Sequence, residues 1–125
     1  MDKLFVEATD ITPQVEFDKQ KNIFRIEGKS LPEDVKFFYS RLIQWFEVYS
    51  LDPNPETNLI IDFEYFNTSS SKMILLLLTK IRDIQKRGYP VQITWFYPTQ
   101  DPEIEDAGEE FAEILNIPFE FIAKD

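Results

Sequence analysis

Apolar and polar residues alternate in two stretches near the start of the chain. Val15 and Phe17 are separated by an acidic residue, and Phe24 and Ile26 flank an arginine in the same way. A period of two is typical of strands with one buried face, and the polar segment 19–22 between the two stretches has the length of a hairpin turn. The pattern predicts a β-hairpin, preceded by a short strand over residues 4–6.

Three later segments have the period of an amphipathic helix. The first follows Ser30-Leu31-Pro32-Glu33, which has the spacing of a capping box, so we expect a helix that begins there and ends before the prolines of segment 52–55. The second follows the N-cap residues of segment 67–71 and ends at Gly88, and the third begins at Asp101-Pro102. The residues expected to face inward are Val35, Phe38, Tyr39, Leu42, Phe46 and Tyr49 in the first helix, Ile74, Leu77, Leu78, Ile81 and Ile84 in the second, and Ile104, Phe111, Ile114 and Leu115 in the third.

Strands predicted over residues 57–66, 91–97 and 119–122 alternate with these helices, an order that favours right-handed crossovers and parallel pairing. The strands themselves alternate, which indicates a sheet with one solvated face. We expect Leu59, Ile61, Phe63, Tyr65, Val91, Ile93 and Trp95 to lie under the helices, and Glu16, Arg25, Glu27, Asp62, Glu64, Gln92, Thr94 and Glu120 to be accessible on the opposite face. The predicted fold class is α/β, a mixed sheet with an N-terminal β-hairpin and helices mainly on one face, in a single domain over residues 1–125.

Composition narrows the range of functions. The chain has 13 Lys and Arg against 23 Asp and Glu, a net charge of −10, which argues against nucleic acids and anionic membranes as partners. It contains no Cys and no His, so thiolate nucleophiles, imidazole bases and Cys/His zinc sites are excluded. The apolar run 73–78 is too short to span a bilayer and residues 1–10 lack the apolar stretch of a signal peptide, so we expect a cytoplasmic protein.

Two acidic features suggest metal chemistry at first sight. Asp62 and Glu64 point the same way from one strand, an arrangement that can hold Mg²⁺ or divide acid and base roles. No glycine-rich phosphate loop or third carboxylate accompanies the pair, so a solvated sheet face is the favoured interpretation. The acidic run from Asp101 to Glu110 complements the dipole of a helix start and lacks the spacing of a calcium loop. We therefore expect no metal and no cofactor.

The aromatic residues allow two interpretations. Some of them, including Phe96 on the face expected to be solvated, are candidates for an exposed binding patch, but core packing is favoured for most. The residues concerned are Trp45, Phe46, Trp95, Phe96 and Tyr97.

Four consecutive hydroxyl residues, Thr68-Ser69-Ser70-Ser71, lie where a central strand is expected to end and a helix to begin. Open α/β sheets place their functional crevice at this edge, and free backbone N–H groups at a helix start favour an anion. Ser and Thr are also ordinary cap residues, so an N-cap with spare hydroxyls is the alternative.

Three segments carry a resemblance to a known family: MDKLFVEATDITPQVEF, EYFNTSSSK and DAGEEFAEILNIPFEF. They resemble the SiaC family of bacterial regulatory phosphoproteins, small domains of STAS-like fold related in architecture to anti-anti-sigma factors. The resemblance extends over the whole chain and is most specific at EYFNTSSSK. The Asp-Ser-Gly type of turn found in anti-anti-sigma proteins is replaced here by Asn67-Thr68-Ser69-Ser70, a departure that argues against regulation of a sigma factor.

The resemblance implies a phosphorylation-controlled switch without enzymatic activity. Its unmodified form would bind and activate a diguanylate cyclase in c-di-GMP signalling and biofilm regulation, a partner kinase would phosphorylate Thr68, and a PP2C-type phosphatase would restore the unmodified form. The partner-binding residues implied are Asn67, Thr68, Ser69, Ser70 and Lys72. Two alternatives stay open: a small Mg²⁺-dependent enzyme using Asp62 and Glu64, and a phosphorylation-independent binding module like the anti-anti-sigma proteins.

Overall fold

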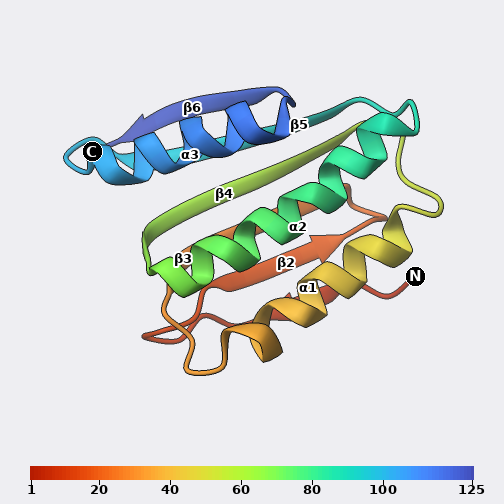
Figure 1. Cartoon of the computed structure of the whole chain (residues 1–125). Helices are drawn as coiled ribbons and strands as arrows, with labels where there is room; N and C mark the ends of the chain where they lie inside the picture. Colours follow the sequence, from red (N-terminus) through yellow and green to blue (C-terminus); the bar gives the residue numbers. More distant parts are fainter.

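Six strands form one sheet in which the order in space follows the order in the chain (Figure 1). The computed structural model describes residues 1–125. The strands are β1 (Leu4–Val6), β2 (Gln14–Asp18), β3 (Ile23–Ser30), β4 (Thr57–Phe66), β5 (Val91–Pro98) and β6 (Phe119–Lys124), and the helices are α1 (Val35–Tyr49), α2 (Thr68–Lys86) and α3 (Pro102–Leu115). None of the three helices combines the length and the hydropathy needed to cross a lipid bilayer.

The first three strands pair antiparallel, and β3 to β6 pair parallel. One helix connects each parallel strand to the next, and every connection steps in the same direction along the sheet. Connections of one hand that step in one direction place their helices on the same face, and all three helices lie in front of the sheet in Figure 1. The predicted fold class is confirmed.

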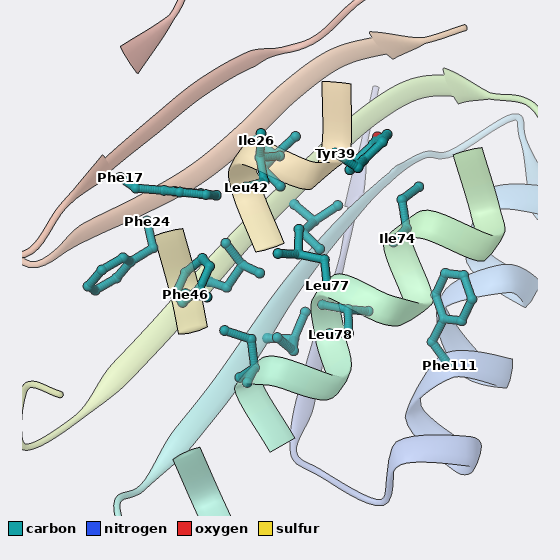
Figure 2. Close-up of a cluster of buried hydrophobic side chains, with 14 of the residues drawn as sticks. Phe17, Phe24, Ile26, Tyr39, Leu42, Phe46, Ile74, Leu77, Leu78 and Phe111 are labelled. Carbon is teal, nitrogen blue, oxygen red and sulfur yellow. The ribbon is translucent and has the colours of Figure 1, made fainter. Parts of the chain in front are cut away.

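A single cluster of 26 buried hydrophobic residues fills the space between the helices and the sheet. Phe17 and Phe24 of the hairpin pack against Phe46 of α1, while Leu77 and Leu78 project from α2 into the middle of the layer (Figure 2). The inward faces predicted for α1 and α2 are confirmed, with Val35 at the margin of the core. Ile114 of α3 was predicted to face inward but is 52% exposed, because Ile104, Phe111 and Leu115 define the buried side of that helix and Ile114 falls on its flank.

The predicted start of α1 is wrong. Ser30 is the last residue of β3, and Asp34 is the N-cap, with a carboxylate that accepts a hydrogen bond from the Phe37 N–H at 3.0 Å. Two constraints keep the chain extended past Ser30. The Leu31 N–H donates to the Ile11 carbonyl at 2.7 Å, and the residue before Pro32 is disfavoured in the α region.

The alternation predicted for β4 is interrupted near its end. Gly28 of β3 pairs with Phe63, but the next residue, Lys29, pairs with Tyr65, so Glu64 is an extra residue in the ladder. Such a bulge exchanges the faces of the residues that follow it. Tyr65, predicted to lie under the helices, is therefore 48% exposed, and Phe66 packs on Trp95 instead.

The face without helices is less open than predicted. Glu64 and Glu120 are exposed, but Asp62 and Thr94 are buried. Asp62 lies beneath two cations, because Lys124 Nζ is 2.7 Å and an Arg25 guanidinium nitrogen is 3.7 Å from its Oδ2. The Thr94 hydroxyl donates to the Asn58 side-chain oxygen at 3.0 Å. Both residues lie on the predicted face, but the long side chains of Arg25 in β3 and Lys124 in β6 reach over Asp62, and Thr94 is bonded to Asn58 of β4.

Gly108 provides a test of the packing between α3 and the sheet. A Cβ at this position would lie 2.5 Å from Trp95 Nε1, closer than van der Waals contact allows. We expect Gly108→Ala to lower the free energy of unfolding by about 1–3 kcal/mol, despite the better helix propensity of alanine, because the indole is fully buried and cannot move away. Urea unfolding measures the change. The exposed control Glu110→Ala should stay within about 0.5 kcal/mol of the parent, and an equally stable Gly108→Ala protein would contradict the packing described here.

Candidate functional site

The carboxyl ends of β3, β4 and β5 lead into the amino ends of α1, α2 and α3, so all three helices begin near the same edge of the sheet. At the centre of this edge Asn67 caps α2. Its side-chain oxygen accepts a hydrogen bond from the Ser70 N–H at 2.9 Å, and its carbonyl accepts one from the Ser71 N–H at 3.0 Å. The N-cap predicted for segment 67–71 is thus Asn67, and Thr68 is the first residue of the helix.

The four hydroxyl residues of this segment differ in exposure. Thr68 and Ser69 are exposed, Ser71 is half-buried, and Ser70 has no accessible surface. Lys72, the other predicted partner-binding side chain, is exposed one helical turn after Thr68. Thr68, Ser69 and Lys72 are therefore available to a partner, whereas Asn67 and Ser70 are engaged in building the first turn.

Ser70 belongs to a buried chain of hydroxyl groups. Its Oγ donates to the Ser30 carbonyl at 2.9 Å and accepts from the Ser30 Oγ at 2.9 Å. Because the Ser30 proton is used in that bond, the Tyr39 hydroxyl, 2.6 Å away, donates to the Ser30 Oγ. This series of hydroxyl groups, from Tyr39 through Ser30 to Ser70, joins the second turn of α1 and the first turn of α2 to the end of β3.

The local sequence indicates other roles for two of these residues, because Ser30 has the spacing of a helix cap and Tyr39 lies on the apolar face of a predicted helix. The available signal was the hydroxyl of a tyrosine in the middle of an apolar helix face, because a buried phenol needs a hydrogen-bond partner.

A cavity of about 210 Å³ opens beside Thr68. Its lining includes Thr68 and Ser71 of α2, Tyr65 and Phe66 of β4, and Asp101 and Glu103 at the start of α3. The Asp101 carboxylate also caps α3 by accepting hydrogen bonds from the Glu103 and Ile104 N–H groups at 3.1 and 3.4 Å. The acidic run therefore begins, as predicted, at a helix start, and its first carboxylates share the cavity with Thr68.

The second candidate pair, Asp62 and Glu64, does not form a joint site. The Asp62 carboxylate is buried and paired with Lys124 and Arg25, while Glu64 is exposed in the bulge. No group of three or more Asp or Glu side chains in the structure is placed to hold a metal ion. Lys124 was missed in the sequence because it lies 62 positions away and comes beside Asp62 only through the pairing of β5 with β6.

Among the aromatic candidates, core packing is confirmed for Trp45, Phe46 and Trp95, which are buried. Phe96 and Tyr97 are half-buried. Phe96 lies on the helix-free face, and the Lys124 Nζ is 5.7 Å from the centroid of the Phe96 ring.

Comparison with known proteins identifies relatives over the full length of the chain. A family model described as SiaC family regulatory phosphoprotein matches residues 6–124. An uncharacterised protein of Pseudomonas aeruginosa strain UCBPP-PA14 is 29% identical over 125 residues, covering 100% of this chain and 99% of that protein.

Solved structures have the same fold. SiaC of Pseudomonas aeruginosa superposes with a TM-score of 0.90 at 28% identity, covering 99% of this chain and 100% of that one. A chain in the crystal structure of the Pseudomonas aeruginosa diguanylate cyclase SiaD in complex with its activator SiaC gives a TM-score of 0.89 at 28% identity, covering 97% and 99%.

The fold and the site together define a small mixed α/β protein that presents hydroxyl side chains at the carboxyl edge of its sheet. The chain belongs to the SiaC family of regulatory phosphoproteins. The resemblance inferred from the three sequence segments is confirmed, and so are the regulatory class and the phosphoprotein class that it implied.

The hydroxyl chain makes stability depend on pH in the alkaline range. Burial raises the pKa of Tyr39 above its ordinary value of 10.0, and hydrogen bonds with its serine neighbours offset only part of the effect. Below pH 10 the Tyr39 phenol is protonated in both the folded and the unfolded protein. Above pH 10 the unfolded chain loses this proton first, so the free energy of unfolding should fall with rising pH, by up to about 1.4 kcal/mol per unit.

Tyr39→Phe isolates this contribution, because other groups titrate equally in both proteins. Urea unfolding at pH 8 to 11 should show a steeper loss of stability above pH 10 for the parent than for the variant. Parallel pH profiles for the two proteins would show that Tyr39 does not retain its proton in the folded state.

Proposed function

We propose that this protein is a non-enzymatic switch whose unmodified form binds and activates a diguanylate cyclase and whose phosphorylation on Thr68 ends that interaction. A partner kinase adds the phosphate and a PP2C-type phosphatase removes it. Membership of a regulatory phosphoprotein family supports the proposal. So does the relative SiaC, which is described in a complex with the diguanylate cyclase SiaD as its activator.

The observation that carries the choice of Thr68 is the division of the hydroxyl cluster into accessible and inaccessible members. Thr68 is exposed at the first position of α2 and borders the cavity, whereas Ser70 is buried and has both its proton and an acceptor site engaged. Ser69 is exposed but does not line the cavity. A kinase that inserts part of its active site into the cavity reaches the Thr68 hydroxyl and not that of Ser70.

Electrostatics explains how the phosphate would act. A phosphothreonine adds about −1.5 to −2 charges to a protein that already carries −10, beside the Asp101 and Glu103 carboxylates that share the cavity. The amino end of α2 offsets part of this charge through its dipole, and Lys72 is the cation nearest along the helix. The fold therefore tolerates the phosphate, while a partner surface that fits the neutral threonine meets a strong anion.

The proposed partner surface consists of Thr68, Ser69 and Lys72, with Asn67 and Ser70 contributing by holding the backbone beneath them. All three surface residues project from the first turns of α2. A partner that contacts this turn is sensitive to a phosphate on Thr68 without any rearrangement of the core.

Substitutions at Thr68 test the proposal. Thr68→Ala should keep the fold, because Asn67 rather than Thr68 is the cap, and should activate the purified cyclase as the parent does while accepting no phosphate from the kinase. Thr68→Glu places one negative charge at the amino end of α2 and should weaken cyclase activation with little loss of stability.

Ser69→Ala is the matched control, because it removes the neighbouring exposed hydroxyl. It should be phosphorylated on Thr68 as the parent is, and mass spectrometry of the kinase-treated proteins maps the phosphate. Phosphate on Ser69 or Ser71 with Thr68 unmodified would refute the site. Equal cyclase activation by the parent and by Thr68→Glu would refute the mechanism.

A further inference from the structure

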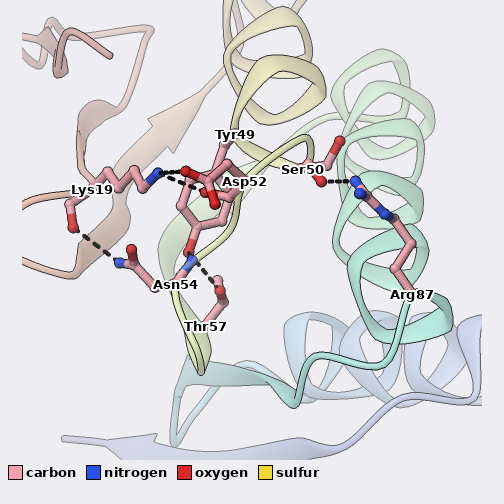
Figure 3. Close-up of polar contacts among 7 residues, drawn as sticks. All are labelled: Lys19, Tyr49, Ser50, Asp52, Asn54, Thr57 and Arg87. Carbon is pink, nitrogen blue, oxygen red and sulfur yellow. Dashed lines mark hydrogen bonds and ion pairs between the residues drawn. The ribbon is translucent and has the colours of Figure 1, made fainter.

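Helix α1 carries two fully buried tyrosines whose hydroxyl groups bond to buried hydroxyl residues at opposite ends of the sheet. Near its amino end, Tyr39 donates to Ser30 in the chain that reaches Ser70. In its last turn, the Tyr49 hydroxyl is 2.7 Å from Thr57 Oγ1 and also accepts from the Asn54 N–H at 3.0 Å (Figure 3). The two tyrosines are chemically alike, but only Tyr39 connects to the first turn of α2.

Three hydrogen bonds fasten that turn to a single residue, Ser30. The Asn67 N–H donates to the Ser30 carbonyl at 3.2 Å, the Ser70 Oγ donates to the same carbonyl at 2.9 Å, and the Ser30 Oγ donates back to Ser70. The first turn of a helix has unpaired N–H groups and is otherwise free to fray. Here two of the three bonds are made by the Ser70 side chain, which has no contact with solvent.

The anchor also determines where Thr68 points. Successive residues of an α-helix are rotated by about 100°, so Thr68 and Ser70 lie about 200° apart around the axis of α2. A first turn held with Ser70 inward therefore presents Thr68 outward, which agrees with their opposite exposures. If the turn loosened, the Thr68 hydroxyl would sample several directions and its distance from the cavity would vary.

We propose that Ser70, Ser30 and Tyr39 are positioning residues for the phosphorylation of Thr68: their buried hydroxyl chain holds the first turn of α2 so that the Thr68 hydroxyl meets the kinase in one orientation. The inference rests on the proposed function. Phosphoryl transfer needs the attacking oxygen in line with the transferred group, so a mobile acceptor lowers the rate of the chemical step. The hydroxyl chain also removes Ser70 from the hydroxyl groups that a kinase can reach.

The test compares Ser70→Ala and Tyr39→Phe with Tyr49→Phe as the matched control. Ser70→Ala removes the contact to α2 itself. Tyr39→Phe removes only the donor at the head of the chain, and it provides the test if Ser70→Ala fails to fold. Tyr49→Phe removes an equally buried phenol from the other end of the same helix and has no connection to Thr68.

The first readout is amide hydrogen exchange in the unmodified proteins. Exchange of the backbone amides at positions 70 and 71 should accelerate about tenfold in Ser70→Ala, which is the effect of losing a buried hydrogen bond. The acceleration should be smaller in Tyr39→Phe and absent in Tyr49→Phe. Unchanged exchange in both Ser70→Ala and Tyr39→Phe, or equal acceleration in Tyr49→Phe, would overturn the anchoring role.

The second readout is the kinetics of phosphorylation by the kinase that modifies Thr68 of the parent protein. Ser70→Ala should lower kcat about tenfold and leave KM for the protein substrate within about twofold, because the docking surface is unchanged and only the acceptor is mobile. A variant that is only less stable has a smaller fraction of its molecules folded at a given concentration. This raises the apparent KM and leaves kcat unchanged.

The outcomes separate the two proposals. Equal kcat for the parent, Ser70→Ala and Tyr39→Phe would overturn the positioning role while phosphorylation of Thr68 stands. No phosphate on Thr68 of the parent protein would overturn the proposed function, and the positioning role with it.

Discussion

Every crossover in this protein steps in the same direction along the sheet, and that constraint determines where the helices begin. Parallel strands β3, β4 and β5 end at one edge, so α1, α2 and α3 start there as well, on the one face that they cover together. Apolar faces buried between helices and sheet hold this arrangement, while the polar groups of the helix starts gather at the edge. A buried hydroxyl chain runs from Tyr39 to Ser70 at this edge, and it links α1 and the start of α2 to Ser30 at the end of β3.

Two kinds of hydroxyl therefore lie next to each other at the start of α2. Ser70 is buried in the interior, and Thr68 is exposed on the surface beside a cavity whose lining includes Asp101 and Glu103. Membership of the SiaC family agrees with the function that we propose for this division, since a regulatory phosphoprotein needs one hydroxyl that an enzyme reaches and a fold that the phosphate does not disturb. A helix start meets both needs, because it tolerates an anion and exposes its first side chain.

The spacing of apolar residues and the positions of turn and cap residues were sufficient to predict the order of the elements, the hairpin, the mixed sheet and the segment in which α2 begins. What they missed depends on contacts between distant residues. Ser30 has the local signature of a cap, but the β3 ladder and the carbonyl of Ile11 hold the chain extended. The bulge at Glu64, which turns Tyr65 outward, exists only in the pairing with Gly28 and Lys29. Asp62 is buried because Lys124 reaches it from β6. The exposure of Thr68 followed from local pattern, but the burial of Ser70 required the fold.

The central claim is that a phosphate on Thr68 is incompatible with the bound partner. The most direct measurement is a calorimetric titration of the purified diguanylate cyclase with two samples of the native sequence, one unmodified and one phosphorylated to completion on Thr68. The account predicts that phosphorylation weakens binding at least about tenfold, which corresponds to about 1.4 kcal/mol, and that phosphatase treatment restores the affinity. Equal Kd values for the two samples would contradict it.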